Sequence, residues 1–148
     1  MKLSKALKEK NRLVGEINRI KQLISRENSR DVKSSSKVDV DKLWLDLNLT
    51  TNKLVTIKAA IFKANVGIYA NIVSMGELKD RIYWMASVNT NNEKSERPYG
   101  EHILTTEYKA CKTQEDIDNM TKAMQDEIAR LQDEIDEYNA TTMIEVEI

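Results

Sequence analysis

The sequence predicts a mainly α-helical protein: an antiparallel, coiled-coil-like four-helix bundle with a small β-hairpin and a C-terminal strand. The 148 residues suffice for one domain, so we expect a single domain over residues 1–148. Four glycines, one proline and eight aromatic residues are few for a β-rich protein. Apolar residues also recur at helical spacing in four segments, which predicts helices at about residues 2–27, 39–64, 75–89 and 114–139.

The first expected helix has an apolar seam on a strongly basic segment. Its seam follows the alternating three- and four-residue spacing of a helix, and only Lys10 interrupts it. Residues 1–37 carry eleven Lys or Arg against four Asp or Glu, a net charge of +7. A polar loop, Ser34-Ser35-Ser36, is expected to end this segment. The seam residues are Ala6, Leu13, Ile17, Ile20 and Ile24.

The second expected helix carries more apolar residues than one face can hold. Asp39 or Asp41 is expected to cap it. Its main stripe consists of Val40, Leu43, Leu47, Thr50, Leu54, Ile57, Ile61 and Ala64. Because Trp44, Leu45 and Leu49 lie outside this stripe, we expect the helix to bury two faces, either at the centre of the bundle or at a subunit contact.

The third helix and the hairpin are expected in the middle of the chain. Ser74 and Glu77 have the spacing of a capping box, which predicts a helix start there and an end near Asn89. Pro98-Tyr99-Gly100 is a turn signal, and the β-branched and polar residues that follow predict a β element at about 101–109.

The fourth expected helix begins after Thr113, with acidic residues in its first turn. Its stripe has heptad spacing and consists of Ile117, Thr121, Met124, Ile128, Leu131, Ile135 and Tyr138. Residues 143–148 alternate apolar and acidic side chains, which predicts a half-buried strand. We expect that strand to pair with His102–Lys109 or with Gly67–Val73.

The two ends of the chain have opposite charge. Residues 113–148 carry eleven acidic and two basic residues, a net charge of −9, against +7 at the other end. The first and fourth helices are therefore expected to pair directly, within one chain or between chains. Each exposed ion pair contributes only about 0.2–1 kcal/mol, so the charges select the partner more than they stabilise it. The alternative is that both charged faces are solvated. A net charge of −1 for the whole chain argues against nucleic acid as a partner.

Residues suited to catalysis or to metal binding are scarce. The lone Cys111 excludes a disulfide within the chain, and one histidine excludes sites that need two imidazoles. The phosphate-binding, dinucleotide, zinc-protease and nucleophile-elbow motifs are absent. A Cys–His pair of Cys111 and His102 is conceivable, but a surface histidine and a small buried cysteine are the simpler interpretation. We expect no catalytic residue, no metal site and no cofactor.

The location of the protein is expected to be the cytoplasm. No window of about 18 apolar residues is present that would span a membrane. The lysine-rich first ten residues are not followed by the apolar segment of a secretory signal.

Several short segments resemble those of the septicolysin-like proteins, a small bacterial family. They are Met1-Lys2-Leu3 with Ala6-Leu7, the stretch Ile57–Asn65, Glu77-Leu78, and Asn139-Ala140-Thr141-Thr142, in the same order. Asn65, Asn139, Thr141 and Thr142 match the family pattern, whereas the family tryptophan is replaced by Ala140 and the chain continues through Met143–Ile148. The resemblance implies a divergent family member and, from the family name, a cytolysin. No long amphipathic hairpin able to enter a bilayer is apparent.

Two functions are compatible with these patterns. The first is a non-enzymatic interaction or scaffold protein that self-associates, with a core or contact surface built by Leu47, Leu54, Ile57, Ile61, Ile128 and Leu131. The second is capture of a nucleotide-like signalling molecule, as in some phage counter-defence proteins, because aromatic rings can stack on a base and arginine can bind a phosphate. The residues expected to bind that ligand are Tyr69, Tyr83, Trp84, Arg97, Tyr99 and Tyr108.

Overall fold

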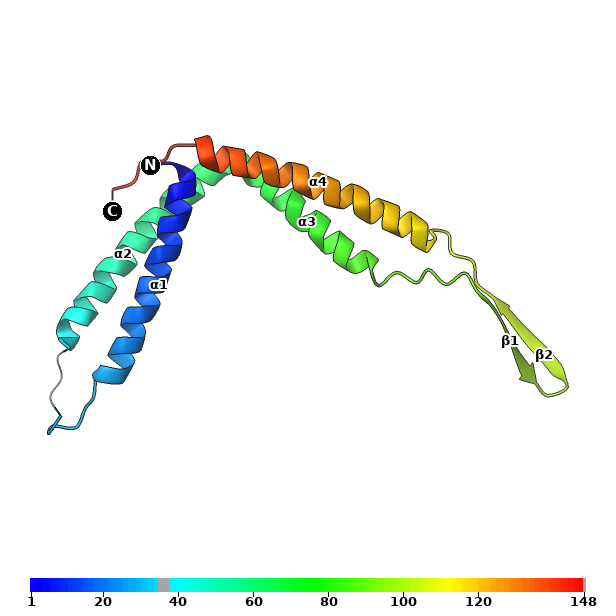
Figure 1. Cartoon of the computed structure of the whole chain (residues 1–148), viewed down its shortest axis with the longest axis horizontal. Helices are drawn as coiled ribbons and strands as arrows, with labels where there is room; N and C mark the ends of the chain where they lie inside the picture. The colour runs from blue at the N-terminus through cyan, green and yellow to red at the C-terminus, as the bar shows by residue number, and fades with distance from the viewer. Residues whose placement is uncertain (35–37, 148) are drawn as a thin grey trace. The chain divides into compact units, whose positions relative to one another are not determined.

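The computed structural model describes residues 1–34 and 38–147 and is mainly helical (Figure 1). The elements are α1 (Leu3–Glu27), α2 (Val40–Asn65), the 3-10 helix η1 (Val66–Ile68), α3 (Tyr69–Met85), β1 (Lys94–Tyr99), β2 (His102–Glu107) and α4 (Gln114–Thr141). The predicted class, mainly helical with a small antiparallel sheet, is confirmed. Because α2, η1 and α3 follow one another without a break, the helical residues of the described chain form three continuous stretches.

The chain divides into two compact units, where the sequence predicts one domain over 1–148. Unit 1 comprises Met1–Tyr69 and Asp136–Ile148, and unit 2 comprises Ala70–Ile135. Unit 1 is therefore discontinuous in sequence, and unit 2 is inserted within it. The last residue, Ile148, and two residues of the predicted serine loop, Ser35 and Ser36, lie outside the described residues.

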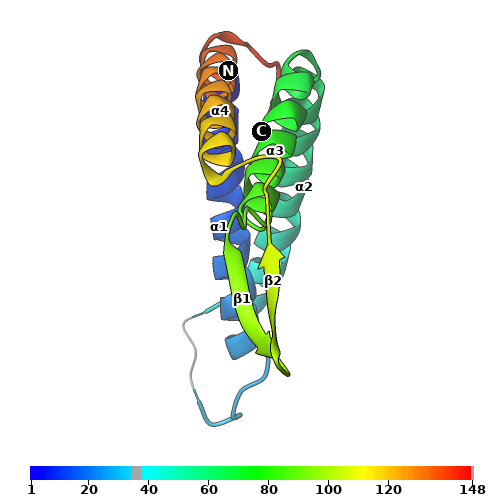
Figure 2. The same cartoon turned by 90° about the vertical axis from the view of Figure 1, so that its right-hand side faces the viewer.

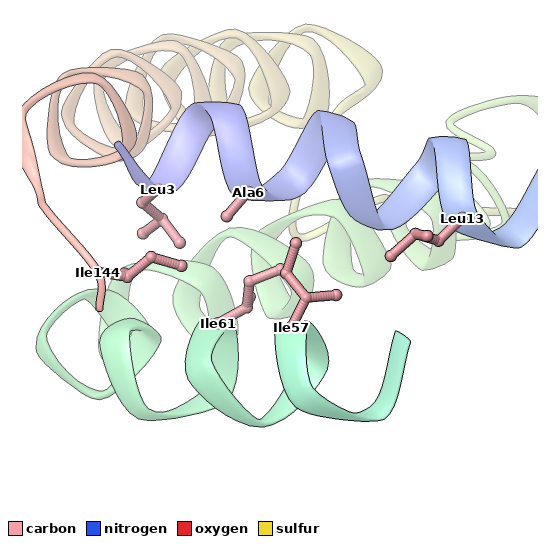
Figure 3. Close-up of a cluster of buried hydrophobic side chains, with 6 residues drawn as sticks. All are labelled: Leu3, Ala6, Leu13, Ile57, Ile61 and Ile144. Atoms are coloured by element: carbon pink, nitrogen blue, oxygen red, sulfur yellow. The ribbon is translucent and has the colours of Figure 1, made fainter. Parts of the chain in front are cut away.

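The core of unit 1 lies between α1 and α2. The whole predicted seam of α1 is buried, from Ala6 to Ile24. Opposite it, α2 buries Ile57 and Ile61 (Figure 3). Each fully buried Leu or Ile side chain contributes about 1.5–3 kcal/mol. The central cluster comprises Leu3, Ala6, Leu13, Ile57, Ile61 and Ile144.

Within the chain, the basic first helix buries its seam against α2, whereas the charges predicted the acidic fourth helix as its partner. Figure 1 shows α1 alongside α2, and the seam is covered there. Apolar complementarity decides this pairing, because exposed charges contribute little. Part of the positive charge of α1 is paired within the helix: Arg12 lies 2.6 Å from Glu9, and Arg19 lies 2.7 Å from Glu16. These arginines lower the pKa of both glutamates.

The start of α2 resolves the choice between two capping residues. The Asp39 side chain accepts a hydrogen bond from the backbone N–H of Lys42 at 3.0 Å, so Asp39 is the N-cap and Asp41 lies in the first turn. This carboxylate satisfies one of the backbone donors that a helix start leaves unpaired.

The predicted capping box at Ser74 and Glu77 is wrong. Both residues lie within α3, which begins at Tyr69 and ends at Met85, earlier than the predicted end near Asn89. No proline interrupts the chain between Asn65 and Ser74, and the single turn of η1 joins α2 to α3. A Ser and a Glu three residues apart cap a helix only where the chain is not already helical.

A contact in unit 1 explains the glycine of that 3-10 turn. A Cβ atom on Gly67 would lie 2.5 Å from the hydroxyl oxygen of Tyr138. The same hydroxyl donates a hydrogen bond to the backbone carbonyl of Ala64 at 2.7 Å. Glycine therefore lets the tyrosine approach the backbone.

The predicted C-terminal strand over 143–148 is also wrong. Beyond α4 the segment forms an isolated antiparallel bridge, between Met143 and Lys2. The backbone N–H of Ile144 donates to the carbonyl of Met1 at 2.8 Å, and the Met1 amino group donates to the carbonyl of Ile144 at 2.7 Å. The segment thus pairs with the start of the chain and not with His102–Lys109 or Gly67–Val73.

Unit 2 contains the predicted hairpin and the predicted start of the fourth helix. Strands β1 and β2 lie side by side (Figure 2). They pair in antiparallel register, with Lys94 opposite Glu107 at one end and Tyr99 opposite His102 at the other. Gly100 in the turn has a φ of 62°, a conformation that glycine adopts at little cost. At the start of α4, the N–H of Asp116 donates to the Thr113 hydroxyl at 3.2 Å, and the N–H of Thr113 donates to the Asp116 carboxylate at 2.9 Å. This reciprocal cap confirms the predicted role of Thr113 and lowers the pKa of Asp116.

Candidate functional site

A concave surface lies between α3 and α4 in unit 2. It is an open groove of about 850 Å³. Its lining residues are Asn71, Val73, Ser74, Glu77, Leu78, Asp80, Arg81 and Trp84 from α3, and Glu127, Arg130 and Leu131 from α4. The apolar part comes from Val73, Leu78 and the buried Leu131, and from Trp84, which is 62% exposed.

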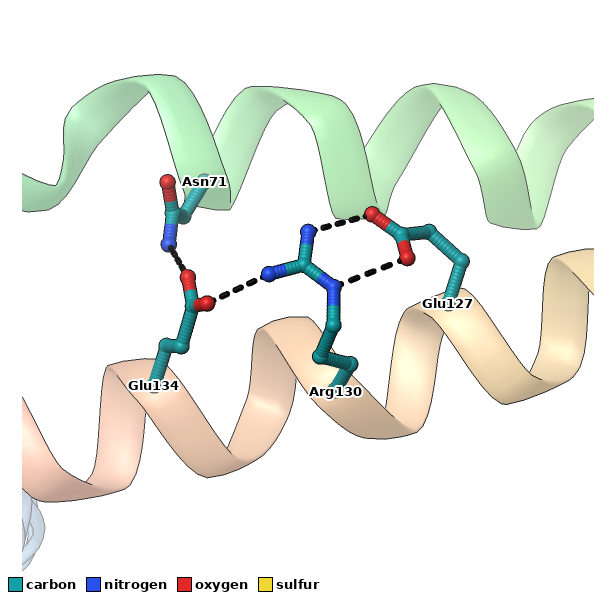
Figure 4. Close-up of polar contacts among 4 residues, drawn as sticks. All are labelled: Asn71, Glu127, Arg130 and Glu134. Carbon is teal, nitrogen blue, oxygen red and sulfur yellow. Dashed lines mark hydrogen bonds and ion pairs between the residues drawn. The ribbon is translucent and has the colours of Figure 1, made fainter.

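A polar network runs along one wall of this groove (Figure 4). The Arg130 guanidinium donates two hydrogen bonds to Glu127, at 2.9 and 2.5 Å, and a third to Glu134. Glu134 also accepts a hydrogen bond from the side-chain amide of Asn71 at 2.6 Å, which links α4 to α3. The network lowers the pKa of Glu127 and raises the pKa of Arg130, chiefly through their mutual hydrogen bonds. Arg130 is thus held by carboxylates of its own helix.

The charges of the groove do not suit an anion. Three carboxylates line it, those of Glu77, Asp80 and Glu127, against two guanidinium groups. Arg130 is already paired with two glutamates, and Arg81 forms no ion pair with any residue that the structure describes. A phosphate would therefore meet one unpaired arginine among several carboxylates.

The six residues expected to bind a nucleotide do not share this groove. Of the six, Trp84 lines it. Tyr83 precedes Trp84 in α3 and is 86% exposed. Arg97 and Tyr99 lie two residues apart on β1, which places them on one face of the hairpin. The other two are distributed between the units: Tyr108 follows β2, and Tyr69 belongs to unit 1.

The six residues expected to build a core or contact surface lie on the inner faces of the helices. In unit 1, Ile57 and Ile61 are buried and Leu54 packs against the same cluster. In unit 2, Leu131 is buried. The remaining two, Leu47 and Ile128, are half-buried.

A second face of α2 is apolar and exposed, and sequence reasoning identified only part of it. Four large apolar side chains along this face of α2 are more than half exposed, and the row continues through Val66 of η1 and Tyr69 at the start of α3. Phe62 is exposed to 75%. We call this set the outer stripe; it consists of Leu45, Leu49, Val55, Phe62, Val66 and Tyr69. Leu45 and Leu49, which lie outside the main stripe, indicated a second apolar face. The spacing of seven residues between Val55, Phe62 and Tyr69 was the signal that this face continues to Tyr69. The groove residues Arg81 and Arg130 were missed as well, although Arg130 has glutamates at helical spacing on either side.

The structure gives no support to a Cys–His site. Cys111 is free and exposed, which corrects the expectation of a small buried residue. His102 lies at the start of β2 opposite Tyr99. Over residues 1–34 and 38–147, no group of three His, Cys, Asp or Glu side chains is arranged to hold a metal ion. The same residues contain no helix that is long and apolar enough to span a membrane.

Comparison with known proteins gives no relative from which a role could be inferred. No protein-family model matches the chain, and no curated protein or solved structure is significantly similar to it. The likeness to septicolysin-like proteins therefore stays a prediction.

Proposed function

We propose that the protein is a non-enzymatic helical interaction protein that self-associates and acts in the cytoplasm. The observation that supports this function is the outer stripe, a row of large apolar side chains exposed on a helix whose opposite face is already buried. Contiguous exposed apolar surface is typical of a protein–protein contact. An exposed free thiol, Cys111, is compatible with a reducing compartment.

A four-helix bundle is part of this proposal, formed between two chains and not, as the sequence predicted, by the four helices of one chain. Within unit 1, α1 and α2 pair and cover one face of α2. A two-helix hairpin leaves its other apolar face in water, and the usual remedy in helical proteins is a second layer of helices. Two copies of unit 1 would supply four helices, so we propose that the bundle forms between chains.

The alternative function, sequestration of a nucleotide signal, has weaker support. Trp84 and Arg81 share one groove, where a ring could stack on a base and a guanidinium could bind a phosphate. Its carboxylates oppose that ligand. If this function is right, Trp84→Ala and Arg81→Ala each abolish nucleotide binding in calorimetry without changing the helix content. On the function we propose, neither variant nor the wild-type protein binds a nucleotide.

Native mass spectrometry of the purified protein tests both functions at once. Self-association predicts a discrete oligomer with no additional mass, confirmed by light scattering on a size-exclusion column at tens of micromolar. A monomer over this concentration range would contradict self-association. An added mass of a few hundred daltons that is lost on denaturation would favour ligand capture instead.

A further inference from the structure

The outer stripe of α2 has the spacing of a coiled-coil contact. Val55, Phe62 and Tyr69 are seven residues apart, and Leu45 and Val66 are three heptads apart at the neighbouring seam position. On the reverse side, Ile57 and Ile61 face α1 and are buried. The helix therefore presents two seams, of which unit 1 covers one.

Apolar residues are unevenly distributed along this stripe. Leu45 and Leu49 form a cluster near the start of α2, and Val55 and Phe62 form a second cluster further along. Between them the exposed residues are polar: Thr51, Asn52 and Lys53. A parallel copy would place like clusters together, and an antiparallel copy would place the first cluster of each chain on the second cluster of the other.

The charges of α2 select the antiparallel orientation. Three aspartates, Asp39, Asp41 and Asp46, precede or occupy the first two turns with a single lysine among them. From Leu47 to Tyr69 the helix carries three lysines and no carboxylate. A parallel partner would align like charges, which is unfavourable, whereas an antiparallel partner would align opposite charges. Three lysines are involved: Lys53, Lys58 and Lys63.

A shallow groove beside the stripe supplies a place for a partner side chain. It has a volume of about 550 Å³ and lies between α2 and the C-terminal segment, next to Val55. Ala59, Ala60 and Val146 form its apolar lining, and Glu145 and Glu147 line it as well. Small residues on the helix leave room for a leucine here.

We infer that α2 is the self-association surface, and that it binds α2 of a second copy in antiparallel orientation. This inference rests on the proposed self-association. With Leu45 opposite the partner's Phe62, Asn48 lies opposite the partner's Ala59 and Asn52 opposite the partner's Val55. In this register Leu49 is level with the partner's Lys58, beside the groove next to the partner's Val55.

The surface is large enough for a stable dimer. In both chains, contact would cover the exposed fractions of Trp44, Leu45, Leu49, Val55 and Phe62. An aromatic side chain buries about 150–250 Å² and an aliphatic one less, so contact over the exposed fractions amounts to roughly 1,000 Å² in total, the lower limit of stable interfaces. We therefore expect a dimer with micromolar affinity.

The test is Phe62→Glu, measured by analytical ultracentrifugation. Since Phe62 is largely exposed, the variant keeps its helix content by circular dichroism, and the dimer dissociation constant rises at least about 10-fold. Tyr83→Glu is the matched control, because Tyr83 is also an exposed aromatic residue on a helix but lies outside the stripe. The control leaves the dissociation constant unchanged.

Cysteine cross-linking tests the orientation in a Cys111→Ser background. Asn48→Cys and Ala59→Cys replace exposed residues that are expected to face each other across the contact. A mixture of the two single-cysteine proteins gives the mixed cross-link, whereas each protein alone gives little dimer.

The outcomes separate the surface from the function. A monomeric wild-type protein overturns self-association and, with it, this surface, even if another protein binds the stripe. A dimeric wild type whose Phe62→Glu variant dimerises equally well overturns the surface and leaves self-association in place. Cross-links of Asn48→Cys to itself and Ala59→Cys to itself overturn the antiparallel orientation.

Discussion

Replacing Gly67 by alanine tests the contact between η1 and the end of α4 in unit 1. The new Cβ atom would lie 2.5 Å from the Tyr138 hydroxyl oxygen and 3.2 Å from the ring carbon that bears it. Overpacking of this kind costs about 1–3 kcal/mol, and it exceeds the 0.5–1 kcal/mol that alanine gains over glycine in a helical turn. The tyrosine cannot retreat without stretching its 2.7 Å hydrogen bond to the carbonyl of Ala64. We expect Gly67→Ala to lower the free energy of unfolding by about 1–2 kcal/mol.

A double-mutant cycle with Tyr138→Phe isolates this clash. Tyr138→Phe alone loses one partly buried hydrogen bond, which costs about 0.5–1.5 kcal/mol. Without the hydroxyl oxygen, the added methyl group meets only the ring edge, so Gly67→Ala becomes nearly neutral in this background. Urea unfolding of the four proteins gives a coupling energy of about 1–2 kcal/mol. Additive effects of the two substitutions would refute the reasoning, because they would show that the oxygen is not what excludes a side chain at Gly67.

Three further predictions concern other elements. Ile57→Ala removes a fully buried side chain and lowers the free energy of unfolding by about 2–5 kcal/mol in chemical denaturation, whereas Val32→Ala, at a fully exposed position, leaves it unchanged. Because the pKa of Asp116 is lowered in the folded protein, the stability that its cap contributes is fully present above about pH 4 and is lost as the pH falls through the lowered pKa. The protection of the amides in the first turn of α4 against exchange then decreases, and Asp116→Asn, which has no carboxylate to titrate, abolishes this pH dependence. Gly100→Ala strains a turn residue at positive φ by about 1 kcal/mol and weakens the cross-strand amide signals of the hairpin in NMR spectra, and Gly100→Asn retains most of them.

Local patterns predicted what is determined locally. The seam from Ala6 to Ile24 is buried as its spacing indicated, because a helix needs only one apolar partner to bury such a stripe. Thr113 caps α4 because Asp116 lies three residues further along the chain, the spacing at which the two residues can exchange hydrogen bonds. The prediction of a helix start at Ser74 from its local spacing was wrong, because nothing in the neighbouring residues shows that the helix has begun at Tyr69.

Pairing between distant residues could not be predicted from the sequence. The alternation after residue 142 correctly indicated that Ile144 is buried and Glu145 exposed, but the partner is Met1, at the far end of the chain. In the candidate groove, too, contacts within one helix could be predicted and contacts between helices could not. The pairing of Arg130 with Glu127 follows from helical spacing, whereas the hydrogen bond from Asn71 to Glu134 joins two helices and has no sequence signature.

The discontinuity of unit 1 has a consequence for synthesis on the ribosome. Unit 2 is one uninterrupted segment, Ala70–Ile135, whereas the cluster around Leu3 also needs Ile144, which is made only after unit 2. While the chain grows, α1 and α2 leave the ribosome with the outer stripe exposed. The cluster between them still lacks the side chain of Ile144. We therefore expect ribosome-bound chains that stop before residue 136 to be more sensitive to proteases in α1 and α2 than the released protein is, because closure of unit 1 waits for the C-terminal segment.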